Sequence, residues 1–152
     1  MLVEDDPIVA YALEQELAEL GGEVLVASDG HAALRLLTDE ILALDLVVTD
    51  LEMPALDGLE LVRLLRTAGG ETELAIVAIA DDTSDDMVAR FRALGVGLLH
   101  KEVGLAAIGQ EARRILEYSG KLEAPSAVPL DDASWAPLPR VRDAKALGRI
   151  TP

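Results

Sequence analysis

Residues 45–58 read DLVVTDLEMPALDG, and this stretch decides which fold the chain can adopt. Residues 46–49 form a continuous run of apolar and β-branched side chains between two aspartates. Such a run is typical of a strand that is buried on both faces of a parallel sheet. The residues that follow it include Pro54 and Gly58, which favour a loop. We therefore expect Asp50 to lie where a central buried strand ends.

Short apolar runs alternate with apolar residues at helical spacing along most of the chain. The runs predict strands at residues 1–3, 23–27, 45–50, 74–80 and 97–100. The helical spacing predicts helices that begin near Pro7, His31, Leu59, Asp85 and Leu105. Five β–α units with short connections predict an α/β fold, a doubly wound parallel sheet with helices on both faces.

Polar residues mark where several of these helices should begin. Asp6 before Pro7 is a favourable N-cap for the first helix. Asp57 is the candidate cap of the third helix. The hydroxyls of Thr83 and Ser84 are the candidate caps of the fourth.

The chain of 152 residues carries a net charge of −15, from 28 acidic and 13 basic side chains. This charge opposes direct binding of the domain to nucleic acid or to anionic membranes. The absence of cysteine excludes disulfides and thiolate ligands. No apolar run approaches the ~20 residues of a membrane span, and no signal-peptide pattern occurs. We therefore expect a soluble, cytoplasmic protein.

The composition changes after Gly120. Five of the seven prolines follow it, and the net charge of +1 from residue 121 onward contrasts with −16 before it. We expect one domain over residues 1–119 and an irregular, Pro-rich C-terminal segment over residues 120–152. That segment is either a linker or a docking tail, for which Trp135 would be the aromatic anchor.

Charged residues follow three of the expected strands. Glu4 and Asp5 follow the first, Asp50 ends the third, and Lys101 follows the fifth. If the strand order is 2-1-3-4-5, the first and third strands are neighbours and the three carboxylates share one crevice. Crowded carboxylates raise one another's pKa values. A divalent cation with oxygen ligands, usually Mg²⁺, is the ordinary remedy.

A carboxylate in such a crevice can attack a phosphoryl group and form an aspartyl phosphate. Asp50 is the candidate nucleophile because it stands alone at the end of the central strand, and Lys101 could neutralise the phosphoryl oxygens. Taken singly, each residue has a plainer interpretation. Glu4 and Asp5 are favourable in the first turn of a helix. Asp50 could be a turn residue at the end of a strand, and Lys101 could be a solvent-exposed lysine. Their joint placement at three strand ends favours a site.

The chain resembles the receiver domain of two-component response regulators, including chemotaxis regulators, over residues 1–119. The resemblance rests on VEDDP at 3–7, SDG at 28–30, DLEMPALDG at 50–58, and Lys101. It implies a (βα)5 flavodoxin-like fold with strand order 2-1-3-4-5. It also implies Mg²⁺-dependent transfer of a phosphoryl group from a sensor histidine kinase or phosphotransfer protein, with a changed interaction with an output protein as the result. Such a protein is a phosphoacceptor rather than a turnover enzyme.

The resemblance also implies a role for each site residue. Asp5 would bind Mg²⁺, and Glu4 would bind it directly or through water. Asp50 would be both phosphoacceptor and metal ligand, and the backbone carbonyl of Glu52 would complete the protein ligands. Lys101 would contact a phosphoryl oxygen. Homodimerisation through the face around the fourth and fifth units is a further expectation.

Two switch positions depart from the family pattern. Ala80 stands where a Thr or Ser hydroxyl is usual, and Leu98 stands where an aromatic ring is usual. These departures leave open a pseudo-receiver, an interaction module whose output is independent of phosphorylation. A phosphohydrolase of the haloacid dehalogenase type is less favoured, because Glu52 stands where such enzymes have a second Asp.

Overall fold

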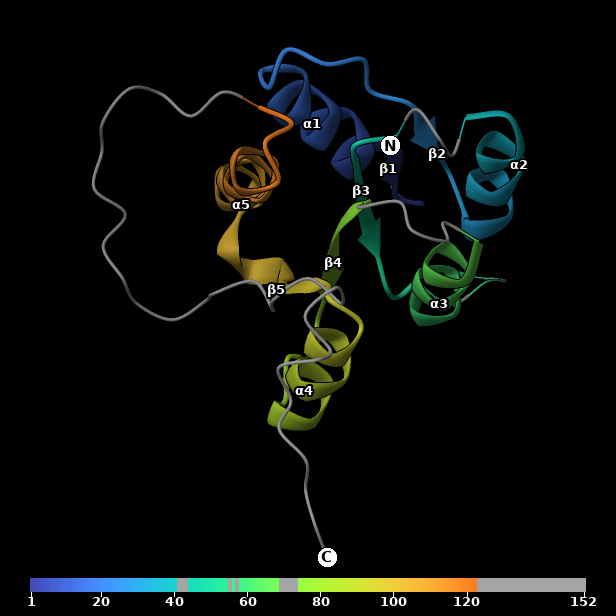
Figure 1. The fold of residues 1–152 in the computed structure, drawn as a ribbon, viewed down its shortest axis with the longest axis vertical. Helices are drawn as coiled ribbons and strands as arrows, with labels where there is room; N and C mark the ends of the chain where they lie inside the picture. The colour runs from blue at the N-terminus through green and yellow to red at the C-terminus, as the bar shows by residue number, and fades with distance from the viewer. Residues whose placement is uncertain (41–43, 55, 57, 69–73, 123–152) are drawn as a thin grey trace, which may run out of the picture.

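Five parallel strands alternate with five α-helices in the computed structural model, which describes residues 1–40, 44–54, 56, 58–68 and 74–122 (Figure 1). The strands are β1 (Leu2–Val3), β2 (Val26–Ala27), β3 (Leu46–Asp50), β4 (Ala75–Ala80) and β5 (Gly97–His100). The helices are α1 (Pro7–Ala18), α2 (Gly30–Glu40), α3 (Gly58–Ala68), α4 (Asp85–Ala93) and α5 (Leu105–Tyr118), with a short 3-10 helix, η2 (Lys101–Val103), after β5.

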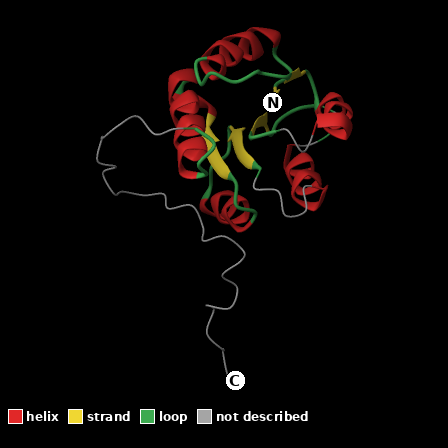
Figure 2. Ribbon diagram, turned by 45° about the horizontal axis from the view of Figure 1, so that its top comes forward, coloured by secondary structure: helices red, strands yellow, loops and turns green. Residues whose placement is uncertain are grey.

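The sheet has the order β2-β1-β3-β4-β5, which confirms the predicted flavodoxin-like topology. Residues of β3 alternate between two cores, because successive side chains of a strand point to opposite faces. Val47 packs in the core beneath α2, α3 and α4, and Val48 packs in the core beneath α1 and α5. Helices therefore cover both faces of the sheet, as Figures 1 and 2 show. No helix among the described residues is long and apolar enough to cross a membrane.

The edge strand β2 is shorter than the sequence predicts. The apolar run suggests residues 23–27, but only Val26 and Ala27 pair, in register with Leu2 and Val3. An edge strand extends only as far as its partner, and β1 itself has two residues. The apolar run alone does not show how many of its residues pair with β1.

The beginnings of two helices show where local prediction succeeds and fails. Asp6 caps α1 as predicted, because its Oδ1 accepts hydrogen bonds from the backbone N–H groups of Ile8 at 2.8 Å and Val9 at 3.3 Å. The predicted hydroxyl cap of α4 is wrong. Ser84 is the N-cap residue but its side chain makes no capping bond, and the Asp82 carboxylate instead accepts from the Ser84 N–H at 2.8 Å. Asp57, and the tail from residue 123, lie outside the described residues.

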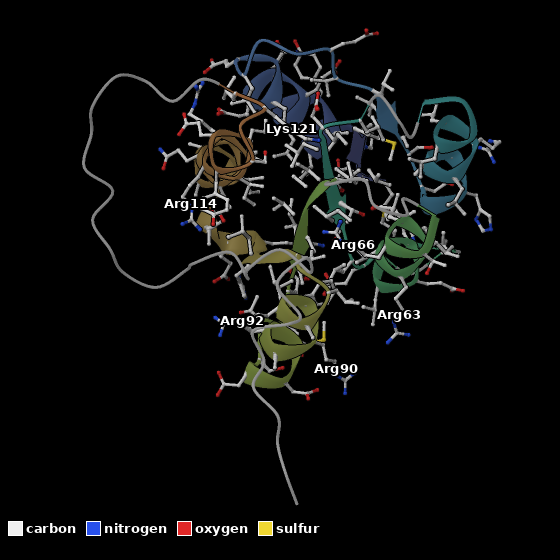
Figure 3. All side chains as sticks on the ribbon, viewed as in Figure 1. Arg63, Arg66, Arg90, Arg92, Arg114 and Lys121 are labelled. Carbon is white, nitrogen blue, oxygen red and sulfur yellow. The ribbon has the colours of Figure 1, made fainter. Side chains whose placement is uncertain are left out.

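Arg66 joins the end of α3 to two other elements. Its guanidinium donates to the carbonyl oxygens of Leu74 at 2.6 Å, Leu94 at 2.9 Å and Gly95 at 2.8 Å. Burial lowers the pKa of Arg66, yet the group stays charged at neutral pH. Figure 3 shows Arg66 pointing from α3 toward the sheet, whereas Arg63 points away from it. Three carbonyls near the start of β4 and the end of α4 thus depend on one side chain.

We expect the substitution Arg66→Met to lower the free energy of unfolding by ~2 kcal/mol, because it leaves carbonyls without their charged donor. Urea denaturation followed by circular dichroism measures the change. Arg63→Met, an exposed position on the same helix, is the matched control and should change stability by less than ~0.5 kcal/mol. Equal losses in the two variants would contradict this role for Arg66.

Candidate functional site

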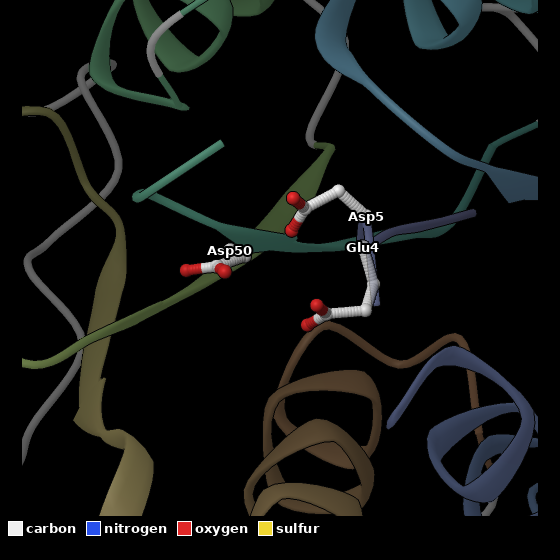
Figure 4. A group of neighbouring side chains, drawn as sticks. All are labelled: Glu4, Asp5 and Asp50. Carbon is white, nitrogen blue, oxygen red and sulfur yellow. The ribbon is translucent and has the colours of Figure 1, made fainter. Parts of the chain in front are cut away.

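Three carboxylates meet at the carboxyl ends of β1 and β3. Glu4 and Asp5 directly follow β1, and Asp50 is the last residue of β3. Because β1 and β3 are neighbours in the sheet, each of the three residues offers a carboxylate oxygen within 4.8 Å of the others. Figure 4 shows the three side chains at this edge. Glu4 is 6% and Asp50 2% exposed, so two of the three acids are nearly removed from water.

The backbone of the sheet positions Glu4. Its N–H donates to the Ala27 carbonyl at 3.0 Å, which continues the pairing of β1 with β2, and its Oε1 accepts from the Asp6 N–H at 3.1 Å. Burial raises the pKa of Glu4, and the neighbouring Asp50 and Asp5 carboxylates raise it further. The sequence predicts the repulsion between acids, but the larger cause is burial.

Lys101 reaches the same edge from the end of β5, which lies on the opposite side of β3 from β1. It follows β5, and its Nζ lies 3.0 Å from Asp50 Oδ2 and 2.9 Å from Glu52 Oε2. Because β4 separates β5 from β3, a long side chain is needed to span the distance. Burial alone would lower the pKa of Lys101, but its hydrogen bonds to Glu52 and Asp50 outweigh burial and raise it. The ammonium is therefore held in its charged form.

The carboxylate of Glu52 is the functional group that sequence reasoning missed. The sequence suggests only its backbone carbonyl as a ligand, whereas its side chain binds Lys101 and its Oε1 accepts from the Asp81 N–H at 3.1 Å. The hydrogen bond from Lys101 is the main cause that lowers the pKa of Glu52. The Glu52 N–H in turn donates to Asp50 Oδ1 at 3.0 Å. The sequence does show an acid two residues after Asp50. It does not show that this side chain would bind Lys101 and Asp81, which lie after other strands.

Two neighbouring groups hold the backbone around Asp50. The buried Thr49 hydroxyl donates to the Asp50 carbonyl at 2.9 Å. The Gly58 N–H donates to the Leu51 carbonyl at 3.3 Å, which brings the start of α3 against the end of β3. A Cβ on Gly58 would lie 2.4 Å from the Asp50 carbonyl oxygen and 2.6 Å from Leu51 Cα. The glycine of the DLEMPALDG stretch is therefore required by close backbone approach.

Ala80 and Leu98, the two positions expected to act as switches, lie on β4, which pairs with β3, and on the edge strand β5. Ala80 is the last residue of β4, is 1% exposed, and pairs in register with His100. Leu98 lies in β5 and packs against the core beneath α2, α3 and α4. Neither side chain has a polar atom. The hydroxyl and ring that the family pattern would place here have no counterpart at these positions.

The donor set at this edge fits a hard divalent cation. Three carboxylates offer oxygen ligands within one small volume, and oxygen is what Mg²⁺ and Ca²⁺ prefer. Lys101 is bonded to the Asp50 side of the cluster, and a second positive charge would relieve the repulsion that burial intensifies at Glu4. The site thus combines a buried Asp50 carboxylate, the Lys101 ammonium bonded to it, and three clustered acids whose oxygens could hold a cation.

Comparison with known proteins places this geometry in context. Residues 1–113 match the family described as the response regulator receiver domain. The chain is 31% identical over 150 residues to the virulence sensor protein BvgS of Bordetella bronchiseptica, covering 95% of this chain and 11% of that protein. It is 33% identical over 120 residues to the transcriptional regulatory protein PrrA of Mycobacterium tuberculosis, covering 79% of this chain and 50% of that protein. The chain thus spans half or less of these curated relatives.

Solved structures show the same fold. The chemotaxis protein CheY4 of Vibrio cholerae superimposes with a TM-score of 0.67 at 25% identity, covering 76% of this chain and 95% of that one. A protein described as a two-component system response regulator/GGDEF domain protein superimposes with a TM-score of 0.68 at 27% identity, covering 77% and 48%. The similarity to this second protein covers only part of its length.

We expect Gly58→Ala to lower the free energy of unfolding by ~1–3 kcal/mol, because the added methyl group collides with backbone that cannot yield freely. Thermal or urea denaturation measures the loss. Gly22→Ala is the matched control, since a Cβ there meets no atom within 4 Å, and it should be nearly neutral. A neutral Gly58→Ala would show that the loop is not held as tightly as its contacts indicate.

Proposed function

This chain belongs to the response regulator receiver domain family, and on that premise we propose that Asp50 accepts a phosphoryl group from a sensor histidine kinase or phosphotransfer protein. The modification changes how the domain interacts with an output protein. The observation that supports this proposal most strongly is the surroundings of Asp50. Its buried carboxylate ends the central strand, lies among two other acids, and contacts the Lys101 ammonium at 3.0 Å.

Each residue of the site has a separate role in the phosphoryl transfer. An Asp50 carboxylate oxygen forms the new bond to phosphorus, and the bond from phosphorus to the donor's leaving group breaks with its electron pair going to that group. Lys101 supplies a fixed positive charge where negative charge gathers on the phosphoryl oxygens. The Glu52 N–H and the Thr49 hydroxyl hold the Asp50 carboxylate and backbone in place.

Mg²⁺ is the proposed cofactor. Glu4, Asp5, Asp50 and the backbone carbonyl of Glu52 would hold it, with Glu4 bound directly or through water. When bound, the ion supplies positive charge that neutralises the clustered acids and the phosphoryl oxygens. The raised pKa of Glu4 indicates a carboxylate whose charged form lacks sufficient compensation from the protein alone.

The alternative of a pseudo-receiver is favoured by one observation, the apolar pair at Ala80 and Leu98. Without a hydroxyl or an aromatic ring there, phosphorylation of Asp50 lacks the usual route to the β4–α4 side of the sheet. The two candidates differ in one measurable property. A pseudo-receiver would show no change in the amide spectrum of α4, β5 and α5, nor in oligomeric state, when Asp50 is phosphorylated.

We expect incubation with Mg²⁺ and acetyl phosphate to add one phosphoryl group to the wild-type chain and none to Asp50→Asn, because the amide is not a nucleophile. Intact-mass spectrometry measures the addition, and chelation of Mg²⁺ should reduce it strongly. Asp86→Asn, an exposed acid on α4, is the control and should be labelled like wild type. Equal labelling of wild type and Asp50→Asn would contradict the proposal.

We expect the chain to bind Mg²⁺ in the absence of any phosphodonor, with an affinity that Asp5→Asn lowers by about tenfold or more. Loss of a residue that hydrogen-bonds to a metal ligand typically lowers metal affinity by about 10–100-fold. Loss of a charged ligand itself should lower the affinity by at least as much. Isothermal titration calorimetry measures the affinity, again with Asp86→Asn as control. Unchanged affinity in Asp5→Asn would exclude Asp5 as a ligand.

A further inference from the structure

The carboxylate of Glu52 lies between Lys101, which contacts Asp50, and the loop from β4 to α4. One oxygen, Oε2, is 2.9 Å from Lys101 Nζ, and the other, Oε1, accepts from the Asp81 N–H at 3.1 Å. Asp81 is the first residue after β4. A single side chain thus ties the loop after β3 to the residue after β5 and to the β4–α4 loop.

Lys101 is shared between two acids at almost equal distance. Its Nζ lies 3.0 Å from Asp50 Oδ2 and 2.9 Å from Glu52 Oε2. A phosphoryl group on Asp50 would therefore compete directly with Glu52 for the Lys101 ammonium. A phosphoryl group carries a charge of about −1.5 to −2 at neutral pH, so it would attract Lys101 and repel Glu52.

We propose that Glu52 transmits the phosphorylation of Asp50 to the β4–α4 loop, in place of the hydroxyl that is absent at Ala80. This inference rests on the proposed function of Asp50. When the phosphoryl group draws Lys101 away, Glu52 loses its counter-ion and turns from the site. Its Oε1 then leaves the Asp81 N–H, and the loop that leads into α4 is released. Glu52 acts in this way as a positioning residue.

The neighbouring Asp82 shows why this role belongs to Glu52 in particular. Asp82 also holds a backbone N–H, that of Ser84 at 2.8 Å, but this bond is confined to the loop itself. The bond from Asp81 to Glu52 instead joins residues 29 positions apart. Glu52 binds both an ammonium at the site and a backbone group on the loop, so a change of charge at one is felt at the other.

The test compares the amide resonance of Asp81 before and after acetyl phosphate and Mg²⁺ are added. We expect a large shift in the wild-type chain, and a shift at least about twofold smaller per bound phosphoryl group in Glu52→Gln, whose neutral amide keeps an acceptor oxygen but is not repelled. Asp82→Asn is the matched control and should respond like wild type. A wild-type response in Glu52→Gln, or an equal loss in Asp82→Asn, would overturn the inference.

A second arm tests the link without any phosphate. Asp50→Asn removes a competitor for Lys101, so Lys101 and Glu52 should pair more tightly and hydrogen exchange at Asp81 should slow by about threefold. The double variant Asp50→Asn with Glu52→Gln should lose this slowing. Absence of the slowing in the single variant would overturn the role of Glu52. Absence of phosphate on wild-type Asp50, measured by mass, would instead overturn the proposed function.

Discussion

The Lys101 ammonium is the charge on which the acidic edge of the sheet depends. Asp50 is 2% exposed and Glu52 lies two residues further along, and both carboxylates are bonded to the same Nζ. Burying charge without a partner is costly, because a low-dielectric interior disfavours the ionised form. Glu4 accepts only the Asp6 N–H and has no ion pair with a cationic side chain among the described residues, and burial raises its pKa. Lys101 neutralises carboxylates on the β5 side of this edge. A bound cation would neutralise Glu4 and Asp5 on the β1 side.

This arrangement is possible only because of the strand order. β1 lies beside β3, so residues that are far apart in the chain bring their carboxylates within 4.8 Å of one another. The two-residue β1 needs only Leu2 and Val3 to be in register, and their side chains enter opposite cores. Gly58 then allows the start of α3 to approach the end of β3 closely. The hydrophobic cores and the glycine therefore define the position of the charged residues.

The chain shares its fold and its family with response regulator receivers, but two residues near the site, Ala80 and Leu98, are apolar where the family usually has a hydroxyl and an aromatic ring. Ala80 and Leu98 are apolar and well packed, so they contribute stability and no hydrogen bond at the site. Glu52 supplies a polar connection from the same edge to the residue that follows Ala80. Exposed ion pairs generally contribute little to stability, and Glu52 is 43% exposed at its side chain. Its network is therefore better suited to responding to charge than to holding the fold together.

The sequence by itself determined the βα alternation and which charged residues end the strands, whereas the sheet order 2-1-3-4-5 was expected only from the resemblance to receiver domains. These depend on apolar periodicity, on caps such as Asp6, and on the rule that parallel strands end together, all of which are visible in local patterns. Tertiary structure alone decided the length of β2, which is limited by β1, and the start of α4, where the Ser84 hydroxyl makes no capping bond and the Ser84 N–H instead donates to Asp82. It also decided the contacts of Glu52. Which partners a flexible carboxylate reaches depends on how the loops after β3, β4 and β5 converge, and no local pattern records that convergence.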